Sequence, residues 1–143
     1  MKNRFTVLLI EDNTEDVRLL QEMIKDIESD LLHPFILNLT HAASVKETVQ
    51  HTDKIFDVIL LDLTLPDSKG MKTVSSIINQ FKGVPVVVLT GITDAEMGVA
   101  AVKGGAQDYL VKNEITSALL LRSIQYAIER LRIVREKEQL IAD

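Results

Sequence analysis

Short runs of apolar residues recur along the chain and predict its strands. Residues 4–10, 56–61 and 84–90 are mostly apolar, and a shorter run spans 108–112. A continuous run of Val, Ile and Leu between turn-forming residues is typical of a strand covered on both faces, as in the centre of a parallel sheet. Residues 35–39 alternate apolar and polar side chains, which favours a strand with one less covered face. The pattern therefore predicts five strands.

The segments between these strands place apolar residues three and four positions apart, which is the spacing of one helical face. In the first segment Val17 and Leu20 share such a face, and Asn13 or Thr14 can cap the helix. Two further helix starts are marked by capping-box pairs, Ser44 with Glu47 and Thr93 with Glu96. Helices are expected from about residue 14 to the break at His33-Pro34, from 44 to about 50, from 71 to Gly83, from 93 to about 103, and from about 114 to the last residue.

Strands that alternate with single helical segments imply parallel neighbours joined by right-handed crossovers. The expected fold is α/β, a doubly wound five-stranded parallel sheet of the flavodoxin-like (βα)5 type with strand order 2-1-3-4-5. A chain of 143 residues is most simply one domain around one core. In this strand order a crevice opens between the carboxyl ends of the first and third strands, where such sheets bind ligands.

Composition narrows the class of protein. The net charge of −5 argues against direct nucleic-acid binding, because neutralising phosphates requires a basic surface. The chain has no cysteine, which excludes disulfides and cysteine-based metal sites. No apolar run approaches the roughly 20 residues of a transmembrane helix, and residues 5–10 are too few for a signal-peptide core. We therefore expect a cytoplasmic protein without membrane contact.

Polar and charged residues follow four of the predicted strands at the edge where parallel strands end. Glu11 and Asp12 end the first strand, Asp62 the third, Thr90 the fourth and Lys112 the fifth. Carboxylates packed together repel, which raises one or more of their pKa values unless a cation intervenes. Mg²⁺ prefers such oxygen ligands, while a lysine and a hydroxyl suit the oxygens of a phosphoryl group. These groups are what the formation of an aspartyl phosphate requires.

The motifs along the chain are Glu11-Asp12, Asp62 with Pro66 and Gly70, Thr90-Gly91, Gly104-Gly105-Ala106 and Tyr109 to Lys112. Each motif is weak alone, whereas their order on successive strand ends is specific. With this set the chain resembles, over roughly residues 4–128, a receiver domain of two-component response regulators of the chemotaxis-regulator type. One position departs from the family pattern, because Asn113 stands where many receivers have proline after the lysine.

The resemblance implies a phosphoacceptor and a metal site. Asp62 is the expected phosphoacceptor, which takes a phosphoryl group from the phosphohistidine of a sensor histidine kinase or a phosphotransfer protein. Glu11, Asp12, Asp62 and the backbone carbonyl of Thr64 are the expected Mg²⁺ ligands. The domain is then a signalling module that assists its own phosphorylation and dephosphorylation, and is not an enzyme acting on a separate substrate.

The resemblance also implies how the phosphoryl group is recognised and read. Lys112 is expected to pair with this group and Thr90 to hydrogen-bond to it. Tyr109 matches the switch aromatic that turns inward when the Thr90 hydroxyl moves, which would change the surface around the fourth helix, fifth strand and fifth helix. Thr64 and Ile92 match variable positions at the rim of the pocket, where the lifetime of the phosphoryl group is expected to be set.

The residues alone leave simpler interpretations open. Asp62 can be an ordinary turn residue and Asp12 a helix cap, and Lys112 can be a structural salt-bridge partner of Asp62. Tyr109 can be a strand aromatic that packs on a helix. Three histidines show no metal-ligand spacing and are expected at surface or turn positions: His33, His41 and His51.

Two other functions are alternatives to phosphoacceptance in a receiver. A haloacid-dehalogenase-like phosphatase also forms an aspartyl phosphate, but that family places its nucleophile after the first strand and a second Asp two positions later. Here Asp62 follows the third strand and position 64 is Thr. A non-phosphorylated interaction module would neither bind Mg²⁺ nor react with a phosphodonor.

The last helix is expected to extend beyond the receiver domain. Residues 1–128 suffice for that domain, and residues 129–143 keep a helical apolar period while becoming highly charged. This extension fits a solvated overhang, a linker to a further module, or a short coiled coil with a second copy. About two heptads are marginal for an independent coiled coil. A homodimer through the last helix, or through the surface around the fifth strand, is therefore expected as one arrangement.

Overall fold

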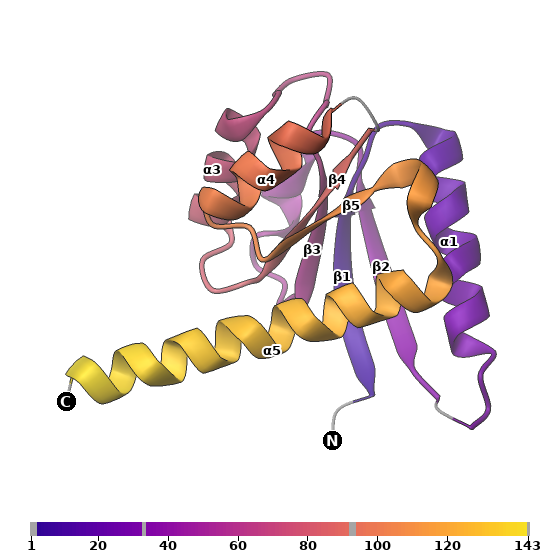
Figure 1. Ribbon diagram of the computed structural model, residues 1–143. Helices are drawn as coiled ribbons and strands as arrows, with labels where there is room; N and C mark the ends of the chain where they lie inside the picture. Colours follow the sequence, from indigo (N-terminus) through magenta and orange to yellow (C-terminus); the bar gives the residue numbers. More distant parts are fainter. Residues whose placement is uncertain (1–2, 33, 92–93, 143) are drawn as a thin grey trace.

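Five parallel strands form a single sheet among the residues that the structure describes, which are 3–32, 34–91 and 94–142 of a computed structural model (Figure 1). The strand order is β2-β1-β3-β4-β5, so the predicted doubly wound sheet is confirmed. All neighbouring pairs are parallel. The strands are β1 (Arg4–Ile10), β2 (Ile36–Ala42), β3 (Val58–Asp62), β4 (Val86–Thr90) and β5 (Asp108–Val111).

Helices cover both faces of this sheet. They are α1 (Thr14–Glu28), α2 (Val45–Thr48), α3 (Met71–Gln80), α4 (Ala95–Lys103) and α5 (Ser117–Ala142), with the short 3-10 turns η1 (Val49–His51) and η3 (Lys112–Glu114). The buried side chains of α1 and α5 pack in one core, and those of α3 and α4 pack in the other. The sheet is thus the middle layer of three.

Alternate residues of the central strands face the two cores. Leu8 and Ile10 of β1 belong to the core beneath α3 and α4, whereas Val7 and Leu9 belong to the core beneath α1 and α5. Every residue of β3 and β4 is buried. Because both faces are covered, these strands show no apolar–polar alternation in the sequence. The two cores fix the strands, and therefore the positions of the residues at their carboxyl ends.

Several boundaries differ by a few residues from the prediction. β3 begins at Val58 and not at Phe56, whose ring packs edge-on against Phe81 with centroids 6.1 Å apart. β4 begins two residues after the expected start. β5 ends at Val111, so Lys112 opens the turn η3 and does not close the strand. The apolar runs therefore include buried residues just outside the hydrogen-bonded ladder.

Side chains at the helix starts satisfy free backbone amides. Asn13, one of the two candidate caps, is the residue that caps α1. Its Oδ1 accepts hydrogen bonds from two first-turn amides at 3.0 and 3.1 Å. Ser44 caps α2 by accepting from the Glu47 amide at 3.1 Å, and the Glu47 carboxylate accepts from the Ala43 amide at 2.7 Å. Three residues of the sequence prediction lie outside the described residues: His33, Ile92 and the expected cap Thr93.

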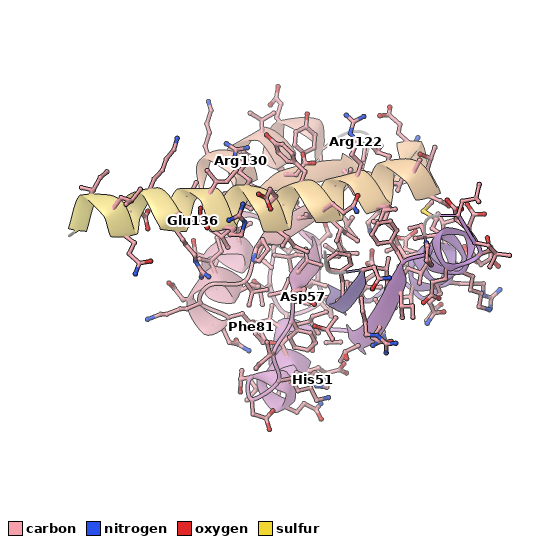
Figure 2. The ribbon with its side chains drawn as sticks, turned by 90° about the horizontal axis from the view of Figure 1, so that it is seen from below. His51, Asp57, Phe81, Arg122, Arg130 and Glu136 are labelled. Atoms are coloured by element: carbon pink, nitrogen blue, oxygen red, sulfur yellow. The ribbon has the colours of Figure 1, made fainter. Side chains whose placement is uncertain are left out.

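The last helix, α5, extends well past the sheet (Figure 1). Leu120, Ile124 and Ala127 are fully buried, whereas Leu140 is 77% exposed. Figure 2 views the helix from below, with Arg122 and Glu136 among the labelled residues along it. Within the described part of the chain, no helix combines the length and apolar character needed to cross a membrane. The receiver boundary at residue 128 and the roles suggested for residues 129–143 stay predictions.

Candidate functional site

The adjacent strands β1 and β3 end at the upper edge of the sheet in Figure 1, and three carboxylates converge at these strand ends. One oxygen from each of Glu11, Asp12 and Asp62 lies within 4.8 Å of the others. The pairing of Ile10 with Leu61 in adjacent parallel strands places the next residues of both strands side by side. Glu11 is fully buried and Asp62 is 4% exposed, whereas Asp12 is exposed to solvent. The predicted acidic site is therefore assembled.

Lys112 joins this cluster from the turn after β5. Its Nζ lies 2.7 Å from Glu11 Oε1 and 3.4 Å from Asp62 Oδ1. The same ammonium group donates a hydrogen bond to Asp16 Oδ2 at 3.0 Å. Burial alone lowers the pKa of Lys112, but Glu11 and Asp16 outweigh burial and hold the pKa above its ordinary value. Lys112 is therefore a permanent positive charge beside Asp62.

Glu11 carries a carboxyl group of this cluster whose ionised form is disfavoured by its surroundings. Burial, followed by the neighbouring Asp62 carboxyl group, raises the pKa of Glu11 from 4.5 to about 8, although Lys112 opposes the rise. Crowding of carboxylates was expected to raise a pKa here, and burial is the larger cause. Without a metal ion, the protonated form of Glu11 is therefore more favoured than that of an ordinary glutamic acid.

The residues present fit a hard cation. Glu11 Oε1 is buried, and its partner among the described residues is the Lys112 ammonium group, 2.7 Å away. A cation bound between Glu11 and Asp62 would offset the proximity of these two carboxyl groups, which helps to raise the pKa of Glu11. Mg²⁺ is satisfied by one to a few carboxylates together with water. Glu11, Asp12 and Asp62 therefore form a suitable donor set, with the exposed Asp12 leaving room for water.

The loop after β3 holds the Asp62 side chain in place. Asp62 Oδ1 accepts a hydrogen bond from the Thr64 amide at 3.2 Å. Thr64 in turn forms an isolated antiparallel bridge with Lys69. Gly70, with φ of 67°, donates its amide to the Leu63 carbonyl at 2.9 Å. A residue with a side chain would be strained at this φ, so glycine lets the loop close directly onto α3.

Thr90 lies on β4, the strand next to that of Asp62, and Tyr109 lies on β5, one strand further along the sheet. Thr90 is 2% exposed, and its Oγ1 donates to the Leu110 carbonyl at 3.5 Å, which is a long hydrogen bond. The half-buried Tyr109 ring packs against α4, and a Cβ atom on Gly98 would lie 2.6 Å from the Tyr109 Cδ2 atom. A strand aromatic that packs on a helix is the simpler of the two interpretations of Tyr109 that the sequence leaves open. Its switch role stays a prediction.

Two residues at the site were missed from the sequence. Asp16 contacts Lys112, and the His41 imidazole donates through Nε2 to the Glu11 carbonyl oxygen at 2.6 Å. The pairing of β1 with β2 could have indicated His41, because it lies opposite Leu9, two residues before Glu11. Asp16 lies in the first turn of α1, four residues after Asp12, and this spacing is a weaker indication that the two residues belong to one site.

The family model of the response regulator receiver domain matches residues 7–125. The chain belongs to this family. The resemblance seen in the sequence is therefore confirmed, and it implies a role in phosphorelay signalling. Receiver domains in general bind Mg²⁺, in agreement with the acidic cluster formed here by Glu11, Asp12 and Asp62.

Curated relatives of this receiver domain are longer proteins. It is similar to the transcriptional regulatory protein CitT of Halalkalibacterium halodurans, with 24% identity over 98% of this chain and 59% of the relative. It is also similar to the transcriptional regulatory protein CusR of Escherichia coli K12, with 33% identity over 62% of this chain and 39% of the relative. The chain thus spans less than two thirds of the length of either relative.

Solved receiver domains share the fold. A response regulator receiver domain protein from Clostridium thermocellum has a TM-score of 0.73 at 24% identity, covering 91% of this chain and 98% of that one. The signal receiver domain of a LuxO repressor homologue from Vibrio parahaemolyticus has a TM-score of 0.72 at 26% identity, covering 98% of both chains. The near-complete coverage supports the five-stranded architecture across almost the whole chain.

Proposed function

We propose that this receiver domain accepts a phosphoryl group on Asp62 in a reaction that depends on Mg²⁺. The convergence of charge at Asp62 is the observation that carries the proposal. Asp62 is 4% exposed, Lys112 Nζ lies 3.4 Å from its Oδ1, and Glu11 and Asp12 complete the acidic cluster. A buried nucleophile beside a fixed lysine and a metal-binding pair is suited to phosphoryl transfer.

The proposed donor is the phosphohistidine of a sensor histidine kinase or a phosphotransfer protein. A carboxylate oxygen of Asp62 forms the new bond to phosphorus while the phosphorus–nitrogen bond of the donor breaks. The electron pair of that bond stays on the imidazole nitrogen. Lys112 offsets the charge of the phosphoryl oxygens. Glu11, Asp12, Asp62 and the Thr64 carbonyl would hold Mg²⁺, which would supply further positive charge for the phosphoryl oxygens.

The signal is proposed to pass from Asp62 to the surface formed by α4, β5 and α5. A phosphoryl group adds about −1.5 to −2 charges, together with strong acceptor oxygens. Because the hydrogen bond that the Thr90 hydroxyl donates to the Leu110 carbonyl is long, at 3.5 Å, such an acceptor can compete for this hydroxyl. Movement of the Thr90 hydroxyl is then proposed to let the Tyr109 ring turn inward. Because this ring lies against Gly98, its movement would change the packing of α4.

Exposed apolar residues on this surface and on α5 offer contacts to a partner protein or a second copy. Tyr126 is 56% exposed and Val99 45% exposed, and Ile133 and Val134 on the extension are 41% and 40% exposed. A homodimer through either surface is part of the proposal. Transcriptional regulation is named for the longer relatives CitT and CusR.

The proposal is tested by labelling the protein with a small phosphodonor in the presence and absence of Mg²⁺. We expect Mg²⁺-dependent labelling of the wild type and none of Asp62→Asn. Asp53→Asn is the matched control, because it makes the same change at an exposed residue outside the cluster. Label at the same site in Asp62→Asn would refute the assignment. Absence of both labelling and Mg²⁺ binding in the wild type would instead favour a non-phosphorylated interaction module.

A further inference from the structure

Lys112 contacts a carboxylate that does not belong to the acidic cluster. Its Nζ donates to Asp16 Oδ2 at 3.0 Å, a shorter distance than the 3.4 Å to Asp62 Oδ1. Among the described residues, the group able to hold a metal ion consists of Glu11, Asp12 and Asp62 and does not include Asp16. Asp16 therefore binds the lysine without being one of the candidate metal ligands.

Both members of the Asp16–Lys112 pair are held in place. The Asp16 amide donates to the Asn13 cap at 3.1 Å, so the residue is fixed in the first turn of α1, where a negative side chain is favourable. The side chain of Lys112 is 24% exposed and that of Asp16 is 32% exposed. The cavity beside them measures only about 10 Å³, roughly the space of one water molecule. It is lined partly by the apolar side chains of Leu19, Leu20, Leu89 and Ile115.

A cation in the acidic cluster changes what holds the lysine. With a divalent ion on Glu11, Asp12 and Asp62, the ammonium group meets the same carboxylates with their charge already neutralised, and it is repelled by the ion. Asp16 keeps its full charge for Lys112, because it lies outside the cluster. At 3.0 Å from Asp16, the ammonium group is still within ion-pair distance of Asp62. The two contacts are therefore compatible.

We propose that Asp16 is a positioning residue that keeps the ammonium group of Lys112 beside Asp62 when a divalent cation occupies the cluster. The inference rests on the proposed phosphoacceptor function and deepens it. In this arrangement the flexible lysine is already in place when the phosphoryl donor arrives, so less side-chain freedom is lost during the transfer. Asp16 itself touches neither the phosphoryl group nor the metal.

The kinetic test compares phosphorylation rates by a small phosphodonor at saturating Mg²⁺. We expect Asp16→Ala to lower the rate by about three- to tenfold, between the effect of an exposed ion pair and that of a charge-assisted hydrogen bond. Asp16→Glu should restore part of the rate. The control is Glu15→Gln, which removes one negative charge from the same helical turn at an exposed residue and should leave the rate unchanged.

Two results would overturn the inference. One is an Asp16→Ala rate equal to or above that of the wild type, which would mean that Asp16 competes for the lysine. The other is an equal loss of phosphorylation rate in Glu15→Gln, which would mean that the negative charge of this helical turn matters and not the contact between Asp16 and Lys112. Asp16→Asn keeps the shape of the side chain and provides a second variant if thermal unfolding shows that Asp16→Ala is damaged. In a Lys112→Ala background, the Asp16 substitution should change the residual rate no further.

A second readout does not depend on phosphorylation. An ammonium group held in hydrogen bonds exchanges its protons with water more slowly than a free one, so NMR of ¹⁵N-labelled lysine reports its contacts. With Mg²⁺ bound, we expect the Lys112 ammonium signal to persist in the wild type and to be lost in Asp16→Ala. Persistence in both proteins would overturn the inference. A wild type that takes no phosphoryl label but shows this NMR difference would refute only the proposed function.

Discussion

Glu11→Gln is expected to remove a large pH-dependent component of stability. Glu11 is fully buried, and its pKa is raised from 4.5 to about 8, chiefly by burial and then by Asp62. Gln has nearly the same shape and cannot ionise. The pH dependence of the difference between wild type and variant therefore reports the ionisation of this carboxyl group together with its coupling to Asp62 and Lys112.

The sign and size follow from the two pKa values. Below pH 4.5, Glu11 is protonated in both the folded and the unfolded chain, so the contribution of its raised pKa to stability is fully present. As the pH rises towards 8, the unfolded chain loses this proton while the folded chain keeps it. The free energy of unfolding of the wild type should then fall relative to Glu11→Gln by about 1.4 kcal/mol per pH unit, or about 5 kcal/mol in total.

The assay is urea unfolding of both proteins at a series of pH values across this range, with a chelator present to exclude divalent cations. Glu15→Gln, at an exposed residue in the first turn of α1, should show the same fall in the free energy of unfolding as the wild type between about pH 5 and 8, apart from a constant loss below about 1 kcal/mol. Added Mg²⁺ should flatten the fall in the wild type, because ion binding needs the ionised form of Glu11. A difference between wild type and Glu11→Gln that stays constant with pH would refute the reasoning.

Three further predictions concern the free energy of unfolding, measured in urea. Gly98→Ala should lose about 1 to 3 kcal/mol, because its Cβ would meet the Tyr109 ring at 2.6 Å, and prior Tyr109→Ala should remove most of this loss. Asn13→Ala should lose about 1 kcal/mol, since two amides of α1 lose their acceptor. Ile124→Ala, fully buried in α5, should lose about 2 to 5 kcal/mol. Leu140→Ala, 77% exposed in the same helix, should change stability by no more than about 0.5 kcal/mol.

Each of these has a clear contrary outcome. A Gly98→Ala loss unaffected by Tyr109→Ala would mean that the added methyl group meets something other than the ring. An unchanged Asn13→Ala protein would mean that another group caps α1. Equal losses at Ile124 and Leu140 would mean that the exposed end of α5 is packed in solution, for example against a second copy.

The sheet and the acidic cluster could be predicted because both depend on the length of apolar runs. A buried parallel strand must be apolar throughout, so the first charged residue marks its carboxyl end. Glu11 and Asp62 then had to meet, since their strands are neighbours in the doubly wound order. The apolar pattern overestimated β3 and β4 at their starts, because Phe56 and Pro85 are buried outside the ladder.

The contacts of single polar side chains could not be predicted in the same way. Lys112 has a long flexible side chain, and its choice of Asp16 as a further partner depends on where α1 begins relative to the turn η3. The hydrogen bond of Thr90 to Leu110, and the packing of Tyr109 on Gly98, depend on rotamers that the apolar–polar pattern does not encode.

The unbroken helix α5 gives the domain a lever arm. Its buried residues Leu120, Ile124 and Ala127 fix the base of the helix in the core beneath α1 and α5. From residue 129 to Ala142 the helix continues for roughly 20 Å at 1.5 Å per residue. A tilt of about 10° at the base would displace the far end by roughly 4 Å over that length. Repacking beside β5 that tilts the base of α5 would therefore displace residues more, the further they lie from the sheet.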